Sequence, residues 1–224
     1  GVTGTGFINS FAQISGSGNL GYTSGYNTTT NNVFDNGSAD NFNHSILVGD
    51  VPLETINGAV YRRFILDVNE NSGGMDQYIS LDDIQLFVGG TANSNADTFS
   101  SGVLDHDGTL IYRLDNGADH WIALDYSLNH GSGSGDMYFF VLDSLFNGFN
   151  QNDVVTLYSE FGLIGNYTGS GVVNGDYGTS DGFEEWAIDG FSEPQDMVPE
   201  PATTALLLIG LAGIASSRAR KRTH

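Results

Sequence analysis

The chain has 224 residues, of which 39% are apolar and 12% aromatic, and this content is enough to bury a core and excludes wholesale disorder. It contains no Cys, which excludes disulfides and thiol catalysis. All 27 acidic residues but only three of the seven basic ones precede residue 202, so this body has a formal charge of −24, which excludes nucleic acid as a partner and favours bound cations such as calcium.

Residues 1–45 form a segment rich in Gly, Asn and Thr, and this composition is most pronounced over residues 15–43. The segment is predicted to form long surface loops that belong to the following domain. A second interpretation is an extended arm that adds a strand to the sheet of a neighbouring molecule.

Residues 46–188 are predicted to form the body of an all-β domain. Apolar and polar residues alternate in several runs separated by turn residues, and no run in this part has helical spacing. The predicted strands cover residues 60–68, 78–88, 110–114, 121–126, 137–142, 154–161 and 183–188. Short strands of this kind favour an antiparallel β-sandwich or a jelly roll.

Two of these predictions are more detailed. The runs 110–114 and 121–126 flank residues 115–119, a connection that contains Gly, and are expected to pair as a hairpin. Residues 137–142 are apolar without interruption, which predicts a strand buried on both faces.

Asp67, Asn69 and Asn71 are candidate calcium ligands, because alternate residues of a loop can direct their oxygen atoms to one point. An EF-hand is excluded, since Ser72 stands where its glycine is needed and Tyr78 where its bidentate glutamate is needed. A looser calcium site remains. The alternative is that these are solvated turn residues chosen for their backbone preferences.

A second acidic group is expected at one end of the sandwich. It consists of Asp105, Asp107, Asp115 and Asp119, which we also take as candidate calcium ligands. Solvated turns are again the alternative.

No catalytic motif is present, so the protein is not expected to be an enzyme. The run from His130 to Gly135 does not have the spacing of a nucleophile elbow. Glu184 and Glu185 are adjacent in an extended segment and should face opposite sides, which is wrong for a glycosidase pair. Carboxylates that are distant in the sequence could still converge, so a secreted hydrolase stays as a distant alternative.

Carbohydrate binding is another alternative, because exposed aromatic rings can stack on sugars. The candidate side chains for such stacking are Tyr22, Tyr26, Tyr167 and Tyr177.

The C-terminal end differs from the rest of the chain. A linker at residues 189–198 leads to 16 uncharged residues, 202–217, which as a helix would be about 24 Å long and only just short of a bilayer span. The four remaining basic residues follow this run, and by the positive-inside rule they would hold the end of the chain in the cytoplasm and leave the acidic body outside. These residues are Arg218, Arg220, Lys221 and Arg222.

The tail at residues 199–222 resembles the PEP-CTERM sorting signal, which combines a Pro-Glu-Pro motif, a short apolar helix and a basic cluster. The motif is present here as Pro199, Glu200 and Pro201. The resemblance implies export, transient anchoring in the inner membrane through residues 202–217, and processing by an exosortase, a membrane transpeptidase. The mature protein would then reach the cell surface or the extracellular matrix.

Together these observations predict a non-enzymatic structural protein of the cell surface or matrix, sorted by exosortase. Its acidic loops would bind calcium, and it could self-assemble. The alternatives are a carbohydrate-binding module of the exopolysaccharide matrix and, second, a secreted hydrolase.

Overall fold

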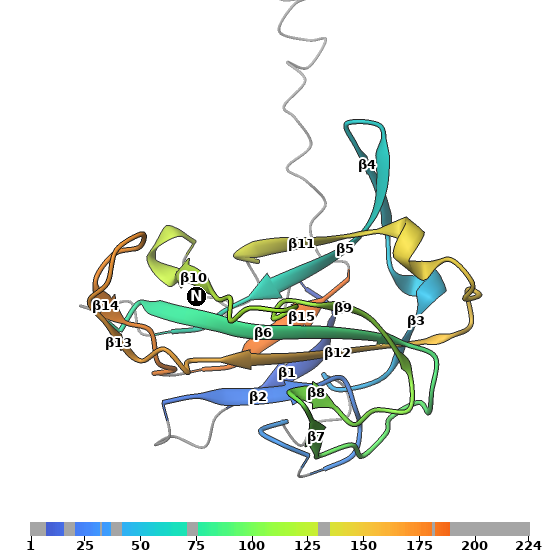
Figure 1. Cartoon of the computed structure of the whole chain (residues 1–224), viewed down its shortest axis with the longest axis horizontal. Coiled ribbons are helices and arrows are strands. Elements are labelled where there is room, and N and C mark those ends of the chain that lie inside the picture. Colours follow the sequence, from blue (N-terminus) through green and yellow to red (C-terminus); the bar gives the residue numbers. More distant parts are fainter. Residues whose placement is uncertain are drawn as a thin grey trace, which may run out of the picture. The chain divides into compact units, whose positions relative to one another are not determined.

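Two antiparallel sheets make up the body of the protein (Figure 1). The computed structural model describes residues 8–15, 21–31, 33–36, 42–70, 76–129, 135–180 and 182–188, which all belong to one compact unit. Every strand pair within these ranges is antiparallel. The all-β, antiparallel prediction is therefore confirmed, whereas the predicted C-terminal helix lies outside the described residues.

The first sheet has the strand order β1-β15-β5-β11, and β4 also pairs with β5. The bounds are β1 Ser10–Ile14, β4 Leu53–Ile56, β5 Ala59–Asp67, β11 Met137–Leu142 and β15 Glu184–Ala187. Asn57 and Gly58 join β4 to β5, and both have the positive φ angles (51° and 84°) that a tight hairpin turn of this length requires.

The second sheet has the order β10-β6-β12-β2, with β3 also paired to β12 and β9 to β6. The bounds are β2 Thr23–Tyr26, β3 Ile46–Leu47, β6 Tyr78–Val88, β9 Thr109–Arg113, β10 Ile122–Asp125 and β12 Val154–Phe161. The predicted strands 78–88 and 154–161 coincide with β6 and β12. The described parts of residues 1–45 supply β1 and β2, one strand to each sheet.

Shorter elements connect these strands. They are the two-residue strands β7 Phe99–Ser100, β8 Val103–Leu104, β13 Asn166–Tyr167 and β14 Gly175–Asp176, and the 3₁₀ helices η1 Val48–Asp50, η2 Tyr126–Leu128 and η3 Asp143–Phe146.

The main core lies between the two sheets, which makes the body a β-sandwich. Phe64 and Trp186 of the first sheet pack in one apolar cluster with Ile84 and Leu157 of the second. Each buried side chain of this size contributes about 1.5–3 kcal/mol through loss of apolar contact with water. The indole Nε1 of Trp186 donates a hydrogen bond of 2.9 Å to Ser159 Oγ, so the polar atom of this buried ring is also satisfied.

A second, smaller core covers part of the other face of β6 and β12. Phe87 and Tyr158 point away from the main core and pack with Tyr26, Val33 and Leu104. The β7–β8 hairpin contributes Leu104 to this layer. The outer face of the second sheet is therefore partly buried.

Two of the detailed strand predictions are wrong. Residues 110–114 and 121–126 do not pair with each other, because β9 and β10 both pair with β6, one after the other along the same edge. The 11-residue length of β6 gives room for both. The strand at 137–142 is not buried on both faces either. It is an edge strand, β11, and Tyr138 and Leu142 on its outer face are 45% and 44% exposed.

Candidate cation-binding sites

Asp67 and Asn69, two of the predicted calcium ligands, lie at the end of β5. Asp67 is completely buried, and its carboxylate accepts hydrogen bonds from Gly135 N (2.9 Å) and Asn69 Nδ2 (3.4 Å). The third predicted ligand, Asn71, lies outside the described residues. The structure therefore brings Asp67 and Asn69 together and leaves Asn71 as a prediction.

Three further carboxylates gather around Asp67, and we call this set the carboxylate cluster: Asp67, Glu70, Asp136 and Glu184. Asn69 N donates to Glu184 Oε2 at 3.3 Å, and Val68 N donates to Asp136 Oδ2 at 2.8 Å. Ser180 donates to Glu70 Oε2 through both its backbone N–H (2.8 Å) and its hydroxyl group.

Burial and repulsion between carboxylates hold two acids of the carboxylate cluster, Glu184 and Asp136, toward their neutral forms. Desolvation, followed by repulsion from Glu70, raises the pKa of Glu184 well above its ordinary value. Desolvation, with a smaller contribution from the charge of Asp67, raises the pKa of Asp136 to about 7. A bound cation would reverse these shifts, because it stabilises ionised carboxylates.

The arginines of the body do not neutralise this cluster. Arg62 Nε lies 2.9 Å from Asp143, Arg63 Nη1 3.3 Å from Glu54, and Arg113 Nε 4.0 Å from Asp83. Before residue 202 the sequence contains no other Arg and no Lys. The arginine side chains of the body are therefore not available to neutralise the carboxylate cluster. Bound protons, histidine or a cation taken from solution are left to do so.

The predicted second acidic group is not one group, so this prediction is wrong. Asp105 and Asp107 precede β9, whereas Asp115 and Asp119 follow it. The five extended residues of β9, at about 3.3 Å each, separate the two pairs. Asp107 is bound to Thr91 N (2.9 Å) and Thr91 Oγ1 (2.6 Å), and these hydrogen bonds lower its pKa. Asp105 is exposed.

Asp115 and Asp119 instead line a pocket of about 490 Å³ with three other acids, and we call it the acidic pocket. Its lining residues are Asp82, Asp83, Phe99, Gly102, Arg113, Asp115, Asp119, Tyr158, Glu160, Leu163 and Ile164. The pocket lies beside the second core, on the outer face of β6 and β12. The backbone N–H of His120 donates to Asp115 Oδ1 at 2.8 Å and so fixes the loop that carries both predicted aspartates.

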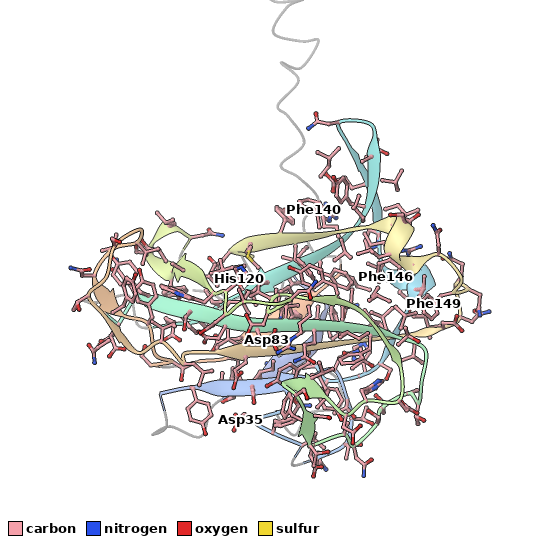
Figure 2. The ribbon with its side chains drawn as sticks, in the orientation of Figure 1. Asp35, Asp83, His120, Phe140, Phe146 and Phe149 are labelled. Atoms are coloured by element: carbon pink, nitrogen blue, oxygen red, sulfur yellow. The ribbon has the colours of Figure 1, made fainter. Side chains whose placement is uncertain are left out.

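A β-bulge explains why two adjacent residues, Asp82 and Asp83, both line this pocket. Glu160 is opposite Asp83 and Phe161 is opposite Leu81, so Asp82 is an extra residue on β6. In a regular strand, neighbouring side chains point to opposite faces, and a bulge redirects one of them. Figure 2 shows Asp83 on β6.

Hydrogen bonds hold one oxygen of each of these aspartates. Asp82 Oδ2 accepts from Ser80 Oγ (2.9 Å) and Leu163 N (2.8 Å), and Asp83 Oδ2 accepts from Gln85 Nε2 (2.7 Å). The second oxygen, Oδ1, is buried in both side chains and has no hydrogen-bond partner among the described residues. The two residues are only 7% and 6% exposed.

The acids of the pocket repel one another. Burial raises the pKa of Glu160 to about 7, and the charges of Asp82 and Asp83 add to this shift. Burial is also the main reason why the pKa values of Asp82 and Asp83 are raised. Arg113 is the single basic side chain among the lining residues.

The four tyrosines that were predicted to be exposed differ in their exposure. Tyr22 is 40% exposed, but Tyr26 and Tyr177 are each only 1% exposed, so the prediction that these two could stack on sugars is wrong. Tyr26 belongs to the second core, and the Tyr177 ring stacks on Tyr78 at a centroid distance of 5.4 Å. Tyr167 is half-buried.

A different row of rings, absent from the sequence prediction, lies on the outer face of the first sheet. Phe140 of β11, labelled in Figure 2, lies between Tyr138 at 5.9 Å and Tyr61 of β5 at 6.3 Å, measured between ring centroids. Residues at every second position of a strand share a face, so Tyr138 and Phe140 point the same way.

Within the described ranges, no three His, Asp or Glu side chains meet closely enough to enclose a metal ion by themselves. Those ranges also contain no helix with the length and apolar character of a membrane span. The predicted linker 189–198, the sorting motif Pro199–Pro201, the apolar run and the basic cluster all lie outside the described residues.

Comparison with protein families nevertheless identifies the tail. Residues 198–222 match the family described as the PEP-CTERM protein-sorting motif, which confirms the resemblance seen in the sequence. The comparisons with curated proteins and with solved structures returned no match. The matched residues concern how the chain is sorted and do not include the β-sandwich.

Proposed function

We propose, from the premise that this chain is an exported PEP-CTERM protein sorted through exosortase from a membrane-anchored precursor, that its β-sandwich is a calcium-stabilised structural component of the cell surface or extracellular matrix. In this proposal the protein is not an enzyme. The sorting signal delivers the domain, and calcium keeps the acidic domain folded outside the cell.

The observation that carries the calcium proposal is the carboxylate cluster. The body contains no Lys, and its three arginines lie against acids outside this cluster. Glu184 and Asp67 are at most 1% exposed, so bulk water solvates their charges poorly. Calcium prefers oxygen ligands, and carboxylates are the commonest of these. Asn71, adjacent to Glu70 in the sequence, stays a predicted ligand.

Thermal unfolding with and without calcium tests the proposal. At about 5 mM calcium, an ion that binds only the folded state with a Kd of about 10⁻⁴ M adds about 2 kcal/mol. For a domain of this size we expect the Tm to rise by about 4–8 °C. Glu184→Gln should remove most of this shift, because it deletes a charge at the centre of the carboxylate cluster.

The matched control is Glu54→Gln, which makes the same chemical change on β4, at a partly exposed side chain paired with Arg63. It can lower the Tm itself through loss of this ion pair, but it should keep the full calcium-induced shift. An unchanged Tm of the wild-type protein in calcium would refute the calcium proposal. Equal losses in the two variants would show that general charge, rather than this cluster, is responsible.

The destination can be tested separately. Replacing Pro199, Glu200 and Pro201 with alanine should leave uncut precursor in the inner membrane, whereas the wild-type chain should be recovered at the surface or in the medium with a reduced or modified mass. Intact-mass measurement of each fraction distinguishes these outcomes. Wild-type protein found only as full-length precursor would contradict release to the surface or matrix.

The row of Tyr61, Tyr138 and Phe140 favours carbohydrate binding as a second candidate function. Neighbouring aromatic rings on a sheet face can stack on sugar units, although these rings are tilted to one another by 32° (Tyr138 and Phe140) and 75° (Tyr61 and Phe140). Binding on a glycan array that is lost in Tyr138→Ala, with the fold intact by circular dichroism, would support it. An array without hits would count against it.

A further inference from the structure

The outer edge of β11 is open to a further strand. β4 and β11 both pair with Tyr61 and Arg62, so they lie on opposite sides of β5. On its other side, β11 pairs with no strand of the described ranges, and Figure 1 shows it as an outer strand beside β5. Half of the backbone N–H and C=O groups of an edge strand point away from its sheet, so this edge can accept hydrogen bonds from one more strand and donate hydrogen bonds to it.

The other sheet edges are less suitable for pairing. Asn43 binds both the N–H (2.8 Å) and the C=O (3.1 Å) of Gln13 in β1. Asn36 binds the same two groups of Tyr26 in β2, at 3.1 Å and 2.6 Å. These hydrogen bonds use backbone groups that an added strand would need. β4 and β10 each contain an acid, and β9 has a register shift against β6.

The sequence of β11 does not protect its edge. Natural edge strands are usually protected by a charge, a proline, a bulge or short length. The six residues of β11, MYFFVL, contain no charged residue, Pro or Gly, and their register with β5 has no bulge. On the outer face, Tyr138 and Leu142 are 45% and 44% exposed. A regular apolar edge of this kind favours the addition of another strand.

The charges beside β11 favour a second copy of this chain as the partner. Two copies of a body with a charge of −24 repel each other over most of their surface. Two of the three arginines of the body, Arg62 and Arg63, lie on β5 opposite Val141 and Phe140. Each arginine is paired with one acid, so both ion pairs are neutral overall. Repulsion between two copies is therefore lower at this edge than over the rest of the body.

We propose that β11 pairs antiparallel with β11 of a second copy of this chain, around a twofold axis at Phe140. Opposite residues of an antiparallel pair share a face, so a twofold axis perpendicular to the sheet passes through a residue. With the axis at Phe140, Tyr138 of each copy lies opposite Leu142 of the other, and the two exposed side chains gain apolar contact. About four to six backbone hydrogen bonds join the two first sheets into one. The dimer rests on the structural role proposed above and gives that role a partner.

Sedimentation velocity of the full-length chain measures the association, in a mild detergent that covers the apolar run 202–217. We expect a reversible dimer with a Kd of about 1–100 μM, because one pair of strands buries a small interface. Phe140→Lys should weaken dimerisation by at least about tenfold, since it places two like charges directly opposite each other.

The matched control is Leu128→Lys, at an apolar side chain that is 83% exposed and lies outside β11. It changes the net charge by the same amount as Phe140→Lys, so general repulsion cannot explain a difference between the two variants. Leu128→Lys should dimerise like the wild-type protein. A wild-type chain that stays monomeric at about 100 μM, or equal effects of the two variants, would overturn the proposal.

The position of the twofold axis has a test of its own, since the chain contains no Cys. The Cα atoms of directly opposite residues lie about 4.5–5.5 Å apart, which is within the range of a disulfide. Under a mild oxidant, Phe140→Cys should form a covalent dimer at least about tenfold faster than Leu128→Cys. Equal rates would refute the axis at Phe140. This variant also tests the pairing if Phe140→Lys fails to fold, which far-UV circular dichroism would show.

Each measurement is made both in calcium and in a chelator, so that the dimer and the calcium proposal can fail separately. A dimer in a protein whose Tm does not respond to calcium would support the strand pairing and refute calcium stabilisation. A monomer with the full calcium-induced rise in Tm would refute the pairing alone.

Discussion

Asp136 lies in the loop that leads into β11 and accepts a hydrogen bond from Val68 N just after β5. Its pKa is raised to about 7 in the folded protein, mainly by burial, from an ordinary value of 3.8. The unfolded chain therefore releases this proton at a lower pH than the folded chain does. As the pH rises from about 4 to about 7, the folded state loses stability, and above about pH 7 this contribution is constant.

Asp136→Asn should remove this dependence. In calcium-free buffer at about pH 7.5 we expect the variant to be more stable than the wild-type protein by roughly 1 kcal/mol, because the amide oxygen can still accept from Val68 N while the buried charge is gone. Urea unfolding at about pH 5 and pH 7.5 in a chelator measures the effect. If the variant were less stable at pH 7.5 without calcium, the repulsion argument would be wrong.

Individual residues of the sites were only partly predictable. Asp67 could be found because its spacing to Asn69 is local, but Asp136 and Glu184 reach the same place from positions more than 60 residues away in the sequence. Local spacing carries no information on such convergence. The pair Asp82-Asp83 did carry a usable signal, since two adjacent acids inside an apolar alternating run break the period and indicate a bulge.

At the scale of elements, the bulge in β6 sets which side chains face the main core. Residues on both sides of Asp82 keep the correct face only because of this extra residue. Ile79 and Leu81 before it, and Ile84 and Leu86 after it, all belong to the main core.

Deleting Asp82 should therefore be much more harmful than changing it. The deletion either restores regular pairing and turns Ile79 and Leu81 away from the core, or shifts β6 by one residue against β10, and both results lose several buried side chains. We expect the deletion variant not to fold, whereas Asp82→Asn, which keeps an oxygen acceptor for Leu163 N, should fold like the wild-type protein. Far-UV circular dichroism and urea unfolding compare them. A folded deletion variant of normal stability would show that the register is not set here.

The strands themselves were easier to predict than their partners. The alternation in β6 and β12 fixed both ranges, because each strand has one face in the main core. The pairing of β9 and β10 with β6, instead of with each other, depends on the length of β6 and on which edge is free. The edge position of β11 likewise follows from the order of strands in the sheet. The apolar run of β11 itself does not indicate this position.

At the scale of the whole molecule, the large negative charge should make stability depend on ionic strength. The body has 27 acidic residues against three arginines, so charge repulsion favours the unfolded chain unless ions screen it. In calcium-free buffer, raising NaCl from about 20 mM to about 300 mM shortens the screening length from about 20 Å to about 6 Å and should raise the Tm.

The same salt change should have a smaller effect in saturating calcium, since bound ions already neutralise part of the charge. Differential scanning calorimetry in the two buffers measures both shifts. A Tm that falls with salt in calcium-free buffer would mean that attractive ion pairs outweigh repulsion in this domain.

The position of β15 in the first sheet has a consequence for the order of events during secretion. This strand lies between β1 and β5, so the earliest and the latest described strands are direct neighbours, with Ser10 opposite Ala187. The sheet cannot be completed until residue 187 has been synthesised and has crossed the membrane, and this residue comes only 11 positions before the sorting motif match begins at residue 198. The chain must therefore pass through the translocation channel as an incomplete sandwich. The insertion of β15 between β1 and β5 then coincides with the arrival of the sorting signal at residues 198–222, which anchors the precursor in the membrane.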